Sequence, residues 1–195
     1  FIYNISFDKA DMTATIYYSN NVLNNIIPKT YFVEVIPDND GHKINLTRMF
    51  TTTSLKNACK LYLENQLLSK VDIYYPSDYN YKASNPSNSN VTKQSVPVYA
   101  EFNGLSGYFL LGIDTIEDSM EVLNYIPESD IFDGLHNYLQ SLEDDYAIIN
   151  YLIDKENKFQ IDVFLQSKST LTIHHDVVKA RFNESTYELE FYKSK

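Results

Sequence analysis

The sequence predicts an α+β protein made mainly of antiparallel sheet, with a β-meander at its C-terminal end and about three packed amphipathic helices. Two patterns carry this prediction. Apolar and polar residues alternate in residues 159–166 and 187–192, which is typical of strands with one buried side. Apolar residues recur every three to four positions in residues 54–69, 114–126 and 129–142, which is typical of helices that bury one face.

The first third of the chain is rich in β-branched and aromatic residues, which favour strands. Turn-forming residues, above all Asn, Pro, Asp and Gly, separate these runs. We therefore expect strands at residues 13–18, 30–36, 42–46 and 71–75. The helix expected at residues 54–69 lies between the last two of these strands.

A polar segment at residues 76–95 contains several Pro, Ser and Asn residues and shows no periodicity. Loops of this length without secondary structure are uncommon inside compact domains. We therefore expect a loop or linker there, between an N-terminal β/α portion (residues 1–75) and a C-terminal α+β portion (residues 96–195). The alternative is one continuous domain.

The C-terminal portion is expected to begin with a β-hairpin formed by residues 96–102 and 108–112. The helix expected at residues 114–126 would start at Asp114 or Thr115, with Glu117 or Asp118 three positions on as a capping box, because this pattern satisfies the first free backbone amides of a helix. After the third helix the meander is expected to use four strands, at residues 147–153, 159–166, 170–175 and 187–192.

The charge balance argues against several classes of function. The chain has 16 Lys and Arg against 26 Asp and Glu, which gives a net charge of −10. Such a balance repels nucleic acids, because phosphate binding depends on Lys and Arg. The sequence has no glycine-rich phosphate loop and no GxSxG motif. We therefore expect no nucleic-acid partner, no cofactor and no serine hydrolase of the common α/β type.

The composition also gives expectations about the setting of the protein. No run of the sequence approaches the ~20 consecutive apolar residues of a transmembrane helix, so we expect no membrane-spanning segment. Because the sequence starts at Phe1, we expect an upstream targeting segment to have been removed and the protein to be extracytoplasmic or in the cell envelope; the alternative is a fragment of a longer protein. A virion or the cytoplasm is the alternative. Abundant Asn, Ile, Tyr and Lys indicate an AT-rich genome.

Tyrosine is the residue type that suggests a binding role, with 17 Tyr among 195 residues. Its large ring and polar tip make it frequent at protein interfaces. The candidate binding residues are Tyr74 and Tyr75, of which one should be exposed on a strand, and Tyr79 and Tyr81, which a solvated loop does not need for a core. The alternative is that AT-rich coding raises the Tyr content irrespective of function.

Two further patterns could indicate a metal site or a reactive cysteine. Asp130, Asp133 and His136 have a spacing that could gather metal ligands on one helix face, but acidic residues in a first helical turn are also favoured by the helix dipole. They are weak candidates, and we expect no metal. Cys59 lies on the apolar face of an expected helix, where burial raises the thiol pKa, so we expect a structural thiol.

Together these observations predict a non-enzymatic interaction or assembly domain with a protein partner. The sequence contains no clear catalytic constellation, and its surface is expected to be acidic and rich in tyrosine. One alternative is a hydrolase that uses carboxylates and a divalent cation, at Asp130, Asp133 and His136 or at Glu188 and Glu190. Another alternative is a domain that senses a small molecule.

Overall fold

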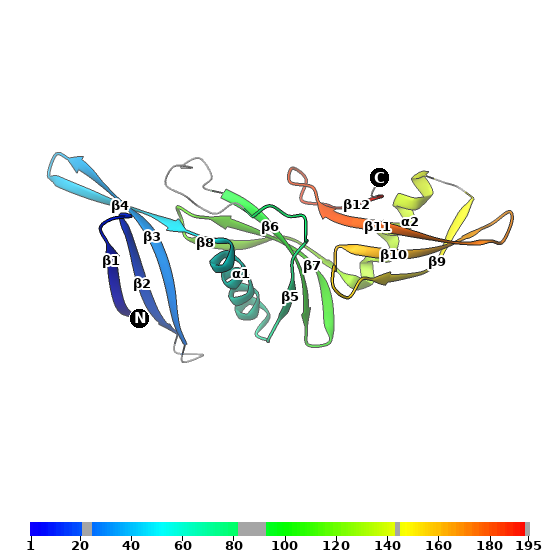
Figure 1. Ribbon diagram of the computed structural model, residues 1–195, viewed down its shortest axis with the longest axis horizontal. Helices are drawn as coiled ribbons and strands as arrows, with labels where there is room; N and C mark the ends of the chain where they lie inside the picture. The colour runs from blue at the N-terminus through cyan, green and yellow to red at the C-terminus, as the bar shows by residue number, and fades with distance from the viewer. Residues whose placement is uncertain (21–24, 82–92, 143–144, 194–195) are drawn as a thin grey trace. The chain divides into compact units, whose positions relative to one another are not determined.

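The computed structural model describes residues 1–20, 25–81, 93–142 and 145–193. Within these residues the chain forms three four-stranded sheets and two α-helices (Figure 1). The strands are β1 (Ile2–Asp8), β2 (Thr13–Asn20), β3 (Asn25–Asp38), β4 (Gly41–Met49), β5 (Asp72–Tyr74), β6 (Lys93–Phe102), β7 (Leu105–Asp114), β8 (Ser119–Pro127), β9 (Tyr146–Ile153), β10 (Gln160–Ser167), β11 (Ile173–Phe182) and β12 (Leu189–Lys193). The helical elements are α1 (Thr52–Leu67), the 3-10 turn η2 (Glu128–Asp130) and α2 (Ile131–Leu142).

The strands are ordered β1-β2-β3-β4, β5-β6-β7-β8 and β12-β11-β10-β9 within the three sheets. Within each sheet, strands that follow one another in the sequence are hydrogen-bonded neighbours. The predicted dominance of antiparallel sheet is confirmed: strands account for 57% of the residues and helices for 18%.

The predicted fold class, with about three packed helices, is wrong, because the expected helix at residues 114–126 is a turn followed by β8. The Asp114 carboxylate accepts hydrogen bonds from the backbone amides of Ile116 (3.0 Å) and Glu117 (3.1 Å). An aspartate makes such bonds equally well in a turn and at a helix start. A Cβ atom on Gly107 would lie 2.6 Å from the carbonyl oxygen of Ile126, so β7 and β8 approach closely there.

The chain divides into two compact units, each assembled from three segments. Unit 1 comprises residues 1–58, 81–94 and 113–120, and unit 2 comprises residues 59–80, 95–112 and 121–195. Of the segment predicted to be a loop or linker, residues 76–95, the part from 82 to 92 lies outside the described residues. The predicted domain ranges stay a prediction.

Unit 1 is organised around the Asp118 carboxylate, which lies in the turn before β8 and binds side chains of the sheet β1–β4. Tyr31 donates its hydroxyl to Asp118 Oδ2 at 2.6 Å, and Lys29 Nζ lies 3.1 Å from the same oxygen. The buried guanidinium of Arg48 lies over the rings of Tyr31 and Phe50, at 5.3 and 4.9 Å from their centroids. Arg48 Nε also lies 3.9 Å from Asp118 Oδ1, so one carboxylate joins β3 and β4 to a distant part of the sequence.

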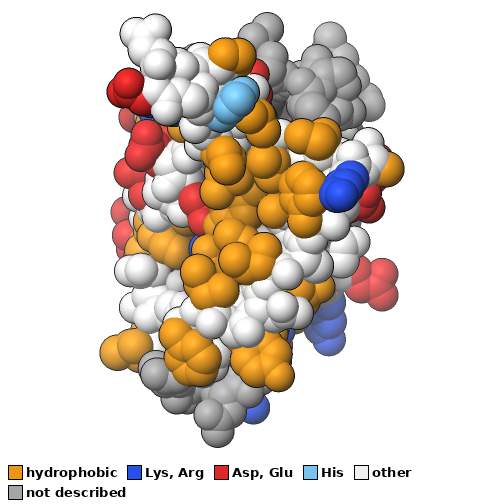
Figure 2. All heavy atoms as spheres, turned by 90° about the vertical axis from the view of Figure 1, so that its left-hand side faces the viewer, with side chains coloured by type: hydrophobic (Ala, Val, Ile, Leu, Met, Phe, Trp, Pro, Cys, Tyr) orange, Lys and Arg blue, Asp and Glu red, His pale blue; other side chains and the backbone are white. Residues whose placement is uncertain are grey.

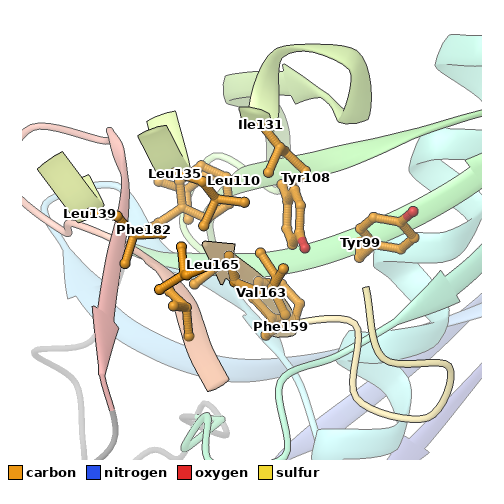
Figure 3. Packing of buried hydrophobic residues seen from close by; sticks show 13 residues of the cluster. Tyr99, Tyr108, Leu110, Ile131, Leu135, Leu139, Phe159, Val163, Leu165 and Phe182 are labelled. Carbon is orange, nitrogen blue, oxygen red and sulfur yellow. The ribbon is translucent and has the colours of Figure 1, made fainter. Parts of the chain in front are cut away.

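Unit 2 has an apolar core between helix α2 and the strands beside it. Helix α2 buries Ile131, Leu135 and Leu139, whose spacing of four residues places them on one face. Strand β10 shows the expected alternation, with every second residue buried. Figure 3 shows these side chains together with Tyr108 and Leu110 of β7 in one cluster.

We expect Leu135→Ala to lower the free energy of unfolding by about 2–5 kcal/mol, because it removes a fully buried side chain and leaves a cavity. The matched control is Leu142→Ala on the same helix, where the side chain is 49% exposed and the change should stay within about 0.5 kcal/mol. Denaturant unfolding of both variants measures the difference. Equal losses would contradict the described packing of α2.

Candidate functional site

Unit 1 exposes apolar side chains on one side of the sheet β1–β4. Directly paired residues of antiparallel strands point to the same side of a sheet. The pairs Val33–Leu46 and Val35–Ile44 therefore share a side, on which the register also places Ile5 and Phe7 of β1. We call this surface the apolar face; its residues are Ile5, Phe7, Val33, Val35, Ile44 and Leu46.

The apolar face is open to solvent. Apart from the half-buried Val33, its side chains are between 43% and 64% exposed. The opposite side of the sheet is more polar and carries several threonines, among them Thr15 and Thr30, whose hydroxyls lie 3.0 Å apart. Figure 2 views this end of the chain and shows hydrophobic side chains gathered over the sheet. An amphipathic sheet normally covers its apolar side with another layer of the protein.

Unit 2 contains a cavity of about 850 Å³. Its walls come from the hairpin between β6 and β7, from η2 and β9, from the start of β5 and the residue Lys70 before it, and from Lys158 before β10. Most of its surface is polar, and Phe102, Leu105 and Tyr151 are among the aromatic and aliphatic residues that also line it. This volume lies within the range of small-molecule binding sites in proteins.

A lysine ammonium is already bound in the cavity wall. Lys158 Nζ lies 2.9 Å from Glu101 Oε1 and 4.9 and 5.4 Å from the ring centroids of Tyr74 and Tyr99. Its side chain is only 12% exposed. The carbonyl oxygen of Lys158 accepts a hydrogen bond from the Tyr108 hydroxyl at 2.6 Å. Both ends of Lys158 are therefore fixed, and its positive charge is neutralised by Glu101.

A second carboxylate, Glu128, is held by hydroxyl groups. Tyr99 donates its hydroxyl to Glu128 Oε2 at 2.6 Å, and Ser106 Oγ donates to the same oxygen. Burial and then this hydrogen bond raise the pKa of Tyr99 above its usual range. Burial and then the charge of Glu128 also raise the pKa of Tyr151. The Glu128 carboxylate is therefore held in place by Tyr99 and Ser106.

The four tyrosines predicted to bind a partner occupy different environments. Tyr74 lies behind the cavity wall, where its ring meets that of Tyr99 edge-on with centroids 6.1 Å apart. Tyr75 is half-buried. Tyr79 is half-buried and donates its hydroxyl to the carbonyl of Ser95, and burial raises the pKa of Tyr79 to about 12. Lys56 Nζ lies 4.8 Å from the ring centroid of Tyr81. Their binding role stays a prediction.

The residues weighed as metal ligands are not gathered into a site. Asp130 belongs to η2, while Asp133 and His136 belong to α2. The His136 ring stacks on Phe132, with centroids 6.0 Å apart. Across the described part of the chain, no group of three or more His, Cys, Asp and Glu side chains is placed to hold a metal ion.

The comparisons with known proteins give no assignment: no family model, curated protein or solved structure matches this chain. No helix within the described residues is both long and apolar enough to cross a membrane.

The residues of the unit 2 cavity were missed by sequence reasoning. Glu101, Glu128 and Lys158 lie in three separate segments and share no motif. The only local signal was the presence of charged residues next to aromatic strands, which is common on protein surfaces. Their proximity depends on the tertiary fold.

The prediction of a buried thiol at Cys59 is confirmed. Its side chain is fully buried, and burial raises the pKa of the Cys59 thiol to about 12. At pH 8 only about 10⁻⁴ of such thiols would be ionised. Because the thiolate is the reactive form, alkylation by iodoacetamide at pH 8 should be at least about 100-fold slower in the native protein than in urea-unfolded protein. Mass spectrometry measures the two rates, and similar rates would contradict the described burial.

Proposed function

We propose that this chain is a non-enzymatic assembly domain and that its apolar face packs against the same face of a second copy. The observation that carries the proposal is the open apolar side of the sheet β1–β4. Five of its six residues are more than two-fifths exposed. The register sets Val33, Val35, Ile44 and Leu46 side by side, and it puts Ile5 and Phe7 on the same side of the sheet, in the rows of Lys29 and Tyr31. Contact with another sheet would remove this surface from water.

The size of the sheet suits such an interface. The exposed apolar side chains present on the order of 400 Å², which is within the range of functional patches on monomers. Four strands about 4.8 Å apart and roughly eight residues long span about 500 Å² in plane. A stable complex buries roughly 800 Å² on each partner, so polar residues around the apolar face would have to contribute the rest of the interface.

The absence of charge on the six residues of the apolar face permits a second copy as the occupant. Two copies that each carry a net charge of −10 repel one another over most of their surfaces. The six residues of the apolar face are uncharged. The register places two cations on the same side of the sheet, Lys29 and Arg48, and both are paired with the Asp118 carboxylate, so two copies could meet here without opposing unpaired like charges. A two-fold symmetric contact uses the same patch on both copies, and facing sheets pack about 10 Å apart.

We expect the purified chain to dimerise in sedimentation equilibrium at micromolar concentrations, and Ile44→Lys to raise the dimer dissociation constant at least about 100-fold. The substitution would bury an unpaired ammonium in an apolar interface. Ile44 is 64% exposed, so the variant should still fold, which circular dichroism checks.

The matched control is Ile26→Lys. Ile26 is 51% exposed on β3 of the same sheet, but the register places it on the side opposite the apolar face. It should leave the dimer unchanged. A wild-type chain that stays monomeric at about 100 μM, or an equal effect of the two substitutions, would overturn the proposal, and binding of a different protein through this face would replace the second copy as its occupant.

A further inference from the structure

We propose that the cavity of unit 2 is a binding site for a primary alkylammonium group, with the Glu128 carboxylate as its counter-ion. This inference is independent of the proposed assembly, because the cavity belongs to unit 2 and the apolar face to unit 1. The ligand chemistry follows from the position of Glu128, from the charge of the lining and from the way in which Lys158 is already bound.

Glu128 has one oxygen available for a ligand. Its Oε2 accepts the hydroxyls of Tyr99 and Ser106, which fix the carboxylate on the cavity wall. In the part of the chain that the structure describes, Oε1 has no hydrogen-bond partner. A carboxylate forms its strongest hydrogen bonds with charged donors. An incoming ammonium group would therefore find a positioned acceptor that needs no rearrangement.

The charge of the lining favours a cation over an anion. The cavity is lined by three carboxylates, of Asp72, Glu101 and Glu128, and by two ammonium groups, of Lys70 and Lys158. The Lys158 ammonium is neutralised by Glu101 at 2.9 Å. The remaining lining carries a net negative charge, which attracts a cationic ligand and repels a carboxylate or phosphate.

The cavity wall already shows how an alkylammonium group is accommodated there. Lys158 places its ammonium between a carboxylate and two tyrosine rings and leaves only 12% of its side chain exposed. Glu128 offers an incoming ammonium group a similar combination of partners, since it is hydrogen-bonded to Tyr99 and the ring of Tyr151 lines the same cavity. The aliphatic lining, Leu105, Leu152 and Ile153, can contact the methylene chain of the ligand.

The test is a ¹H–¹⁵N NMR titration of the full chain with n-pentylamine at pH 7 and 150 mM salt, where loose attraction to an acidic protein is screened. We expect saturable shifts confined to amides that line the cavity. Hexanoate, which has a similar chain and the opposite charge, should cause none. Nα-acetyl-lysine methylamide distinguishes the sources: binding of both amines indicates that a peptide lysine fits, and binding of pentylamine alone indicates a free amine.

Glu128→Gln should weaken pentylamine binding about tenfold or more, because it removes the charge and keeps an acceptor for Tyr99 and Ser106. The control is Glu188→Gln, which removes the same charge from an exposed residue of unit 2 that does not line the cavity. This variant should bind pentylamine with the affinity of the wild type. Equal binding of hexanoate, shifts spread over the acidic surface, or unchanged affinity of Glu128→Gln would each overturn the proposal. If Glu128→Gln fails to fold, the comparison of pentylamine with hexanoate on the wild-type protein still tests the proposal.

Discussion

The structure of unit 2 depends on one buried tyrosine. The Tyr108 ring is fully buried between Tyr99 and Phe159, with centroids 4.9 and 5.2 Å away. A buried hydroxyl must find a hydrogen-bond partner, and that of Tyr108 finds the carbonyl of Lys158. This bond fixes the connection between β9 and β10 against β7. The ion pair of Lys158 with Glu101 can form only where that connection is held.

The two units use polar groups in different ways. In unit 1 the carboxylate of Asp118 gathers Tyr31, Lys29 and Arg48, and this cluster orders the covered part of the sheet while the apolar face stays open. In unit 2 the carboxylates of Glu101 and Glu128 line a cavity and are themselves held by tyrosine and lysine side chains. The open apolar face of unit 1 therefore suits contact with another protein surface. The cavity of unit 2 suits a small charged ligand.

The sequence predicted those elements whose pattern is contained in one segment. The alternation in β10 and the spacing of Ile131, Leu135 and Leu139 both reflect burial of a single element, so the meander and α2 could be recognised. The helix expected at 114–126 failed because Asp114 can cap a helix or close a turn with the same bonds. The cavity could not be predicted, since its charged residues meet only through tertiary packing.

The backbone and the side chain of Lys158 contribute to different parts of unit 2. Its backbone carbonyl completes the core through Tyr108, and its ammonium completes the cavity wall through Glu101. Substitutions around this residue will therefore have non-additive effects, since a shift of the backbone moves the ammonium as well. Over evolution, the folding stability of unit 2 and the chemistry of its cavity are bound to change together, through compensating pairs of substitutions and not one residue at a time.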